Sequence, residues 1–294
     1  MTVNAASLYA QEYATRTVLL LQQKQSKLRS LVSTGSHVGE QASPIDQLGS
    51  VEMIDPSGRF APMGRVDASV ARRWVDPTDK ELPQLFDSFD KLRIISDPQS
   101  QYAANSAAAV GRFYDRLLIT AALATSKTGK TGTGTEAFDT TNFSIAADFG
   151  AAAATGLTVK KLIEARRMFS AAFVDEEDPL TLIVSARQHA NLLNEAQVSS
   201  RDFNDKPVLV DGKVAYFMGF NIVTSEYLTK VSNDRYNIAF AKSGLYLGTW
   251  ADMVSRVSQR NDLTGEPWQH YVKCTAGATR LEQGKVVRIL ATEP

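Results

Sequence analysis

The chain has 294 residues, enough to bury a large core as one large domain or as two ordinary ones. Its 32 Lys and Arg balance its 32 Asp and Glu, which excludes the overall positive charge of a dedicated nucleic-acid reader. The one cysteine, Cys274, excludes an intramolecular disulfide. The apolar runs are only a few residues long, so the sequence predicts no membrane span, and the first fifteen residues lack the basic start and apolar core of a signal peptide.

The N-terminal segment is thin and polar. Residues 4–31 are predicted to form a helix with Gln-rich exposed faces, and residues 32–45 a connector without regular structure. A polar arm at a chain end normally frays unless something holds it. We therefore expect this arm to lie against another chain.

Residues 48–76 are predicted to form an extended hairpin that turns at Asp55–Gly58. It carries little apolar surface for its length, so it needs support from outside the subunit. Residues 77–97 follow, with Leu85 and Phe89 on a predicted short helix. Charge is uneven, because residues 76–97 are acidic and residues 1–35 are basic. This pattern permits head-to-tail contacts between copies, and it fits two solvated faces without mutual contact at least as well.

Residues 97–124 predict one long helix around which the rest of the chain is organised. At roughly 1.5 Å per residue it would be about 40 Å long, well above the mean helix of a globular domain. Apolar and small residues recur on one expected buried face: Ala103, Ala107, Val110, Tyr114, Leu117, Ala121 and Ala124.

The middle of the chain mixes helices and strands. Residues 125–144 are rich in Thr and Gly and are expected to be flexible. Thr158 is expected to cap a helix that buries Leu162, Ile163, Phe169 and Phe173. A buried strand, Leu180–Val184, follows, and Ser185 with Gln188 forms a capping box that opens a helix through Leu193.

The C-terminal third is predicted to be mostly strand. The expected features are a hairpin of 207–210 with 214–217 about Asp211-Gly212, a bulge at Gly219 before strand 220–223, a pair formed by 236–240 and 245–247, two long strands at 254–260 and 270–280, and a last strand at 286–290. The absence of alternating βαβ units argues against a doubly wound nucleotide-binding fold. The sequence predicts an α+β protein.

No stretch of the sequence carries a complete catalytic or ligand-binding motif. Gly129-Lys130-Thr131 lacks the earlier glycine of a phosphate-binding loop, because Ala124 stands in its place. His37, His189 and His270 are far apart and lack zinc-binding spacing, and Cys274 is expected to be a small buried residue. We expect no catalytic residue, no metal and no cofactor.

Trp74 stands beside Arg72 and Arg73 on the predicted hairpin. Large aromatic side chains next to arginine are frequent anchors at protein interfaces. A local contact of Trp74 against the base of its own hairpin is an equally good interpretation.

Five stretches together resemble the tailed-bacteriophage major capsid proteins with the Hong Kong 97-type fold. They are RRWVDPTDKELPQLFDSFDKLRIISDPQSQYAANSAAAVGRFYDRLLITAAL (72–123), LTLIVSARQHANLL (180–193), VLVDGKVAYFMGFNIVTSEYL (208–228), AFAKSGLYLGT (239–249) and ATRLEQGKVVRIL (278–290). No single stretch is specific, but their order and spacing extend over about four-fifths of the chain.

The resemblance implies a division of the chain into the parts of that fold. They are the N-arm (1–47), the E-loop (48–80), the peripheral domain with the spine helix (81–150), the axial domain (151–250), the long strands of the peripheral domain (251–280) and the last strand of the axial domain (281–294). It also implies contacts between subunits from the E-loop residues Arg59, Phe60, Arg72, Arg73 and Trp74. Arm contacts, or contacts with interior DNA, are expected from Arg16, Lys24, Lys27 and Arg29.

The resemblance further implies a non-enzymatic protein of the virion, assembled in the cytoplasm of a host bacterium. Its expected partners are copies of itself in pentamers and hexamers, double-stranded DNA packaged against the inner face without sequence preference, and a portal protein. A separate scaffolding protein, or else assembly directed by the arm, is expected because only some 47 residues precede the E-loop. A decoration protein is a further candidate partner, and no membrane is expected.

Two alternatives stay open on the sequence. An encapsulin-like shell would share the fold and enclose enzymes instead of DNA. A soluble α+β enzyme with an unrecognised site would be indicated if substitution of His189 and His270 abolished a turnover.

Overall fold

The computed structural model describes residues 22–39, 42–55, 58, 64–86, 99–195, 209–210 and 213–293. These residues belong to two compact units. The first takes its residues from 1–26, 79–113 and 251–274, and the second from 27–78, 114–250 and 275–294. The helix α2 (Gln99–Leu123) and the strands β15 (Leu245–Gln259) and β16 (Trp268–Arg280) each belong in part to both units.

The second unit is built on a seven-stranded mixed sheet. Its order is β11-β12-β8-β14-β17-β7, and β13 pairs with β14. The strands are β7 (Ser144–Ile145), β8 (Leu180–Val184), β11 (Tyr216–Phe217), β12 (Phe220–Thr224), β13 (Lys230–Val231), β14 (Asp234–Ala241) and β17 (Val286–Thr292). The buried strand predicted at 180–184 and the last strand predicted near 286–290 are confirmed.

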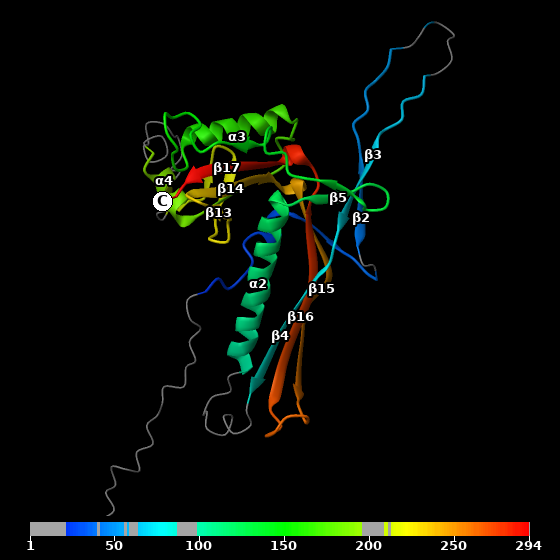
Figure 1. Ribbon diagram of the computed structural model, residues 1–294. Helices are drawn as coiled ribbons and strands as arrows, with labels where there is room; N and C mark the ends of the chain where they lie inside the picture. The colour runs from blue at the N-terminus through cyan, green and yellow to red at the C-terminus, as the bar shows by residue number, and fades with distance from the viewer. Residues whose placement is uncertain are drawn as a thin grey trace, which may run out of the picture. The chain divides into compact units, whose positions relative to one another are not determined.

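Helix α3 (Val159–Ala171) lies along this sheet and covers its apolar face (Figure 1). Leu162 and Phe169 are buried against side chains such as Leu182 and Ile289. The prediction that Phe173 belongs to the buried face of this helix is wrong, because α3 ends at Ala171. Ile163 is also exposed, so the apolar stripe is narrower than the sequence suggested.

The end of α3 is a Schellman motif with phenylalanine at the position where glycine is usual. The Val174 N–H donates to the Phe169 carbonyl (3.1 Å) and the Phe173 N–H to the Ser170 carbonyl (3.2 Å), while Phe173 has φ +55°. A side chain in this left-handed conformation costs about 1 kcal/mol or more. The chain keeps Phe173 there although 96% of the residue is exposed.

Lys161 is fully buried on α3 and holds a loop of the second unit in place. Its ammonium donates to the carbonyl oxygens of Ala147 (2.8 Å), Thr155 (2.9 Å), Gly156 (2.9 Å) and Leu290 (3.2 Å). Burial lowers the pKa of this lysine to about 8. The alanine-rich stretch between residues 147 and 155 is therefore tied to both α3 and β17.

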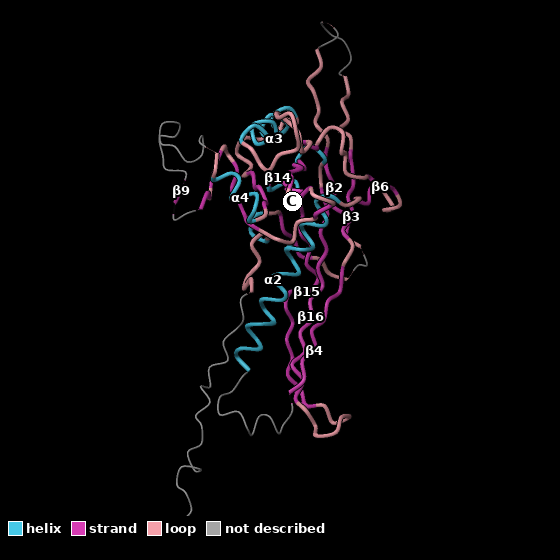
Figure 2. Tube along the Cα trace, turned by 60° about the vertical axis from the view of Figure 1, so that its left-hand side comes forward, coloured by secondary structure: helices cyan, strands magenta, loops and turns pink. Residues whose placement is uncertain are grey.

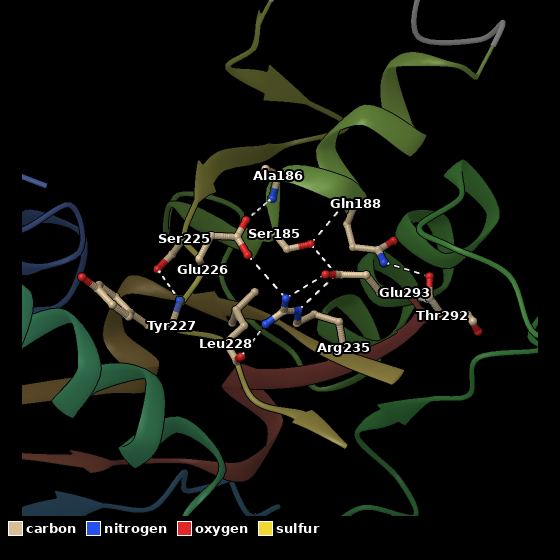
Figure 3. A network of polar contacts seen from close by, with 10 residues as sticks. All are labelled: Ser185, Ala186, Gln188, Ser225, Glu226, Tyr227, Leu228, Arg235, Thr292 and Glu293. Atoms are coloured by element: carbon tan, nitrogen blue, oxygen red, sulfur yellow. Dashed lines mark hydrogen bonds and ion pairs between the residues drawn. The ribbon is translucent and has the colours of Figure 1, made fainter. Parts of the chain in front are cut away.

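Helix α4 (Ala186–Leu193) begins at the predicted cap, Ser185, whose hydroxyl accepts from the Gln188 N–H at 3.3 Å. The same hydroxyl donates to Glu293 Oε2 at 2.7 Å (Figure 3). Arg235 binds both oxygens of Glu293, at 2.7 and 3.1 Å, and approaches Glu226 at 3.4 Å. Two carboxylates and one guanidinium thereby connect the end of β17 to the start of α4.

The predicted Asp-Gly hairpin is confirmed next to its turn, since β9 (Leu209–Val210) pairs with β10 (Lys213–Val214), whereas residues 216–217, predicted to continue it, pair with β12. The predicted bulge at Gly219 is wrong. Met218 (φ +52°) and Gly219 (φ +84°) form the two-residue turn between β11 and β12, which pair in antiparallel. Positive φ at both central residues is what a tight hairpin turn of this kind requires.

The predicted pair of 236–240 with 245–247 is also wrong. β14 lies in the seven-stranded sheet, whereas β15 lies in a four-stranded sheet of order β1-β15-β16-β4. The short 3₁₀ segment Lys242–Gly244 carries the chain from one sheet to the other. β1 (Ser33–Ser36) pairs in parallel with β15, so the predicted connector 32–45 contains a strand.

In the first unit, the outer parts of β15 and β16 lie beside β4 (Thr78–Phe86) in Figure 2, which confirms the two long strands. The short helix predicted over 77–97 is wrong for residues 78–86; residues 87–98 lie outside the described part. From Asp79 to Leu85 only Leu82 and Gln84 are not exposed, a period of two typical of a strand. Pro83 is tolerated because β4 is an edge strand.

Helix α2 confirms the long helix predicted over 97–124. Val110, Tyr114 and Ala121 are buried as expected, whereas Ala103 and Ala107 are exposed. The buried side is completed by residues that the sequence did not select: Ser106, Ala108, Asp115, Leu118, Ile119 and Ala122. Among the described residues, no helix is both long and apolar enough to cross a membrane.

Glu293 predicts a loss of stability in acid. Hydrogen bonding from Arg235, and then from Ser185, lowers the pKa of its carboxyl to about 2, against 4.5 as the ordinary value. A carboxyl with a lower pKa in the folded state stabilises the fold above pH 4.5 and loses that contribution as the pH falls toward 2.

We expect the urea midpoint of the protein to fall as the pH is lowered from 4.5 to 2. Glu293→Gln should be about 1–3 kcal/mol less stable at pH 7, and its urea midpoint should depend less on pH in this range. Glu282→Gln, which removes an exposed partner of Lys285, is the control. An unchanged acid profile in Glu293→Gln would contradict the assignment.

Candidate assembly surfaces

The predicted hairpin has a paired base and an unpaired extension. β2 (Ser43–Leu48) and β3 (Val70–Val75) pair in antiparallel, with Ser43 opposite Val75 and Leu48 opposite Val70. One further bond joins the Gly49 N–H to the Ser69 carbonyl at 2.7 Å. Beyond it the described residues 50–55 and 64–68 form no strand. The hairpin therefore begins at residue 43, five residues earlier than the sequence indicated.

The extension exposes its apolar side chains. Met53 is fully exposed, and Val51, Ile54 and Val66 are each more than two-fifths exposed; Leu48 and Val70, the last pair of the base, are exposed as well. Figure 1 shows both extended segments running out from the end of their sheet. Single exposed apolar residues are ordinary, but a run of them on an unpaired hairpin is typical of an interaction surface. Arg59 and Phe60 lie outside the described residues.

Arg72 and Arg73 lie side by side on β3 but have different surroundings. Arg72 pairs with Asp46 on the neighbouring strand β2, both partly exposed, and this lowers the pKa of the Asp46 carboxyl. Arg73 is nearly buried, pairs with Glu136 and donates through Nε to the Leu281 carbonyl at 2.8 Å. The Arg73 hydrogen bond lowers the pKa of the Glu136 carboxyl, and Gln283 adds to the effect.

Trp74 contacts its own chain, but at residues 129–132 and not at the base of its own hairpin. Its indole N–H donates to the Gly129 carbonyl at 2.7 Å. Gly132, with φ +73°, lies against the indole so closely that a Cβ would be 3.2 Å from the ring. Both glycines belong to the hairpin of β5 (Ser126–Thr128) and β6 (Gly134–Glu136), which joins β3 in one sheet. The stretch 125–144 is therefore partly regular structure, contrary to prediction.

Between β3 and the β5–β6 turn lies a groove of about 400 Å³, which we call the β3–β5 groove. Its lining residues are Val70, Ala71, Arg72, Arg73, Thr128, Gly129, Lys130 and Glu136. Arg73 on β3 is held by its hydrogen bond to the Leu281 carbonyl, and the Trp74–Gly129 hydrogen bond joins β3 to the β5–β6 turn. Both walls of the groove are therefore held in place. Lys130 is exposed, and no contact of its ammonium is found within the described residues.

A buried arginine connects the base of the hairpin to the long helix. Arg280, at the end of β16, donates to the carbonyls of Ala122 and Ala124 (both 2.9 Å), where α2 ends, and to that of Glu136 at 3.3 Å. Burial lowers its pKa to about 10, so it stays charged at neutral pH. A cation at a helix C-terminus complements the unpaired carbonyls and the helix dipole.

The root of the arm is fixed on the same helix within the second unit. The Asp115 carboxylate on α2 accepts from the N–H groups of Lys27 (3.0 Å) and Leu28 (3.1 Å), and Leu28 is buried. Lys27 donates through its ammonium to the Thr224 carbonyl at 2.7 Å. Arg29 lies over the Tyr114 ring at 5.0 Å.

The prediction of a helix through residue 31 is wrong from residue 22 onward, where only Arg29–Leu31 forms a 3₁₀ turn. In the first unit, Gly111 allows this segment close approach, because a Cβ there would be 2.7 Å from the Ser26 nitrogen. The described root of the arm thus contacts its own chain through Ser26, Lys27, Leu28 and Arg29. Lys24 is exposed, and Arg16 lies outside the described residues.

His37, the residue after β1, lies against residues of β2 and β15. Its Nδ1 is 2.6 Å from the Ser43 hydroxyl and its Nε2 is 2.9 Å from the Tyr246 hydroxyl, while its ring lies 4.9 Å from that of Trp250. Gly35 and Gly248 face each other across the β1–β15 pair. A Cβ on Gly35 would meet Tyr246, and one on Gly248 would meet His37.

The other residues considered for chemistry have structural surroundings. His189 accepts from the Val214 N–H at 3.2 Å, and His270 is buried with Ser106 at 3.5 Å. Cys274 is buried as predicted, and burial raises the pKa of its thiol. Among the described residues, no group of three or more His, Cys, Asp or Glu is arranged to hold a metal ion.

A family model described as phage capsid protein matches residues 5–293. The chain belongs to the phage capsid protein family. It is a structural protein, a major capsid protein of a virion. The match favours the phage shell over the encapsulin-like alternative.

Solved structures show the same fold at low identity, which confirms the α+β capsid architecture. The capsid of cyanophage P-SCSP1u is 14% identical with a TM-score of 0.76, over 100% of this chain and 96% of that one. The Ralstonia phage GP4 capsid is 10% identical with a TM-score of 0.73, over 97% of this chain and 96% of that one. The cyanophage Pam1 capsid is 9% identical with a TM-score of 0.73, over 99% of this chain and 98% of that one. No curated protein matches the capsid protein.

The two neighbouring arginines give a matched pair of predictions. We expect Arg73→Ala to destabilise the unassembled capsid protein by about 2–4 kcal/mol, because Glu136 and the Leu281 carbonyl lose their partner in a nearly buried site. Arg72→Ala removes only a partly exposed, solvent-screened pair and should cost clearly less stability than Arg73→Ala. Urea unfolding midpoints measure both, and equal losses would contradict this account.

Proposed function

We propose that this major capsid protein self-assembles, as pentamers and hexamers, into the icosahedral or prolate head that holds the double-stranded DNA of a tailed bacteriophage. The observation that carries the proposal is the unpaired hairpin extension with its exposed apolar side chains, which a neighbouring subunit would cover. Burial of apolar surface stabilises an interface by about 25 cal/mol per Å² before the costs of association.

Residues 48–80 act as the E-loop in this proposal, residues 1–47 as the N-arm, 81–150 and 251–280 as the peripheral domain, and 151–250 with 281–294 as the axial domain. The described core of the seven-stranded sheet, with α3 and α4, falls largely in the proposed axial domain. Assembly takes place in the host cytoplasm, the protein has no catalytic role, and a portal protein, a separate scaffolding protein and a decoration protein are its proposed partners.

The hairpin can be removed without disturbing its base. In a variant in which Asn-Gly replaces residues 50–68, this two-residue turn connects Gly49 to Ser69. The backbones of Gly49 and Ser69 are already hydrogen-bonded to each other. We expect this variant to fold as a subunit, with unchanged far-UV circular dichroism, and to form no shells by sedimentation and electron microscopy. The unaltered protein should form shells under the same conditions.

Two outcomes would contradict the proposal. The unaltered protein could remain a monomer at micromolar concentration, or the shortened variant could assemble as well as the original. Val231→Ser, which alters an exposed apolar residue on strand β13, is the control for loss of apolar surface alone.

Contacts with interior DNA should be electrostatic and independent of sequence. Lys24 is the exposed basic residue of the arm root, whereas Lys27 and Arg29 already have partners in the chain. We expect Lys24→Ala to reduce the slope of log affinity against log salt by roughly one, with equal effects on unrelated duplexes. Arg187→Ala, an exposed cation on α4, should leave the slope unchanged. A sequence-dependent effect would contradict this role.

A further inference from the structure

Phe173 combines two features that do not stabilise the subunit. The residue adopts φ +55° and is 96% exposed. The Schellman motif uses only its backbone N–H, and Val174 packs against the core beside it. Glycine would make the same hydrogen bonds without the strain of a left-handed side chain. A strained position that presents a complete aromatic ring to solvent points to a partner outside the subunit.

Acidic side chains follow directly on the chain. Asp175, Glu176 and Glu177 are exposed, and the Glu177 N–H donates to Asp175 Oδ1 at 3.1 Å, which shapes the turn. Asp178 anchors the end of this turn through Ser243, whose N–H donates to its carboxylate at 3.2 Å. We call Phe173 with Asp175, Glu176 and Glu177 the Phe173 corner. It presents an aromatic ring flanked by negative charge on a fixed turn.

The β3–β5 groove has the complementary character. Val70 and Ala71 give it an apolar side, and Val70 is 70% exposed. Arg72, Arg73 and Lys130 contribute three positive charges. Asp46 pairs with Arg72 and Glu136 with Arg73, so Lys130 supplies the excess positive charge. The contacts of Arg73 and Trp74 hold its walls in place, so little ordering is required on binding.

We propose that the Phe173 corner of one copy docks into the β3–β5 groove of a neighbouring copy. Phe173 remains exposed within its own chain, so the contact needs a second molecule. The two surfaces are different patches of the same protein, which gives a head-to-tail contact that can close into a ring. The inference rests on the proposed self-assembly and names one contact that carries it.

Phe173→Gly separates this role from folding. The substitution removes the ring and relieves the left-handed backbone, so the unassembled subunit should keep its melting temperature or gain a few degrees. We expect the critical concentration for assembly to rise on the order of tenfold, as for the loss of an interface anchor. Ile163→Ala, at an exposed apolar residue of α3 outside the corner, is the control and should assemble normally.

Charge reversal tests the identity of the groove. We expect Glu176→Lys with Glu177→Lys to impair assembly, Lys130→Glu to impair it too, and the combination of all three to restore it at least in part. Light scattering against protein concentration at two salt concentrations measures each variant, and salt should weaken the effect of every charge change.

The outcomes distinguish this inference from the function on which it rests. If the unaltered protein forms no shells, the proposed function fails. If it forms shells and Phe173→Gly assembles at the same concentration, the docking contact is wrong while the function stands. If Phe173→Gly impairs assembly and also lowers the melting temperature, the docking contact is wrong as well, because Phe173 would then stabilise the fold of the subunit. Failure of the triple variant to recover would refute the groove as its partner.

Discussion

The structure depends on how it accommodates the buried charge of Arg280. A guanidinium in the interior needs acceptors for its N–H groups, and here they are the last carbonyls of α2 and the Glu136 carbonyl. The Glu136 carboxylate in turn binds Arg73 at the base of the hairpin. One cation therefore determines where the helix ends, where β6 lies and how β3 is attached.

The arm and the hairpin are attached to the same part of α2 within the second unit. Asp115 receives the backbone of the arm root, and Arg280 connects the helix end to the hairpin base through Glu136. Both attachments are polar groups satisfied inside the protein, whereas the apolar side chains of the hairpin extension are left to solvent. The subunit thus has firmly held roots and apolar surface available to a neighbour, which suits a protein that completes its burial by assembly.

Local signals predicted much of this fold. The period of α2, the buried run Leu180–Val184, the Ser185 cap and the Asp-Gly hairpin are each determined by neighbouring residues in sequence. Errors arose where long-range contacts decide. Nothing near Asp115 indicates that its carboxylate binds backbone groups 87 and 88 residues away, and Arg280 reaches α2 across about 156 residues. Residues 78–86 became a strand because sheet pairing outweighed their mixed apolar pattern.

The facing glycines Gly35 and Gly248 have a mechanical consequence for the chain between the arm and the hairpin. If β1 slipped by one residue along β15, a side chain would enter the slot that now holds the His37 ring. The parallel pair is therefore locked in one register. A force applied along the chain from the arm or from the hairpin would load the hydrogen bonds between β1 and β15 together, in shear. The four-stranded sheet would therefore bear this force before β1 could separate from β15.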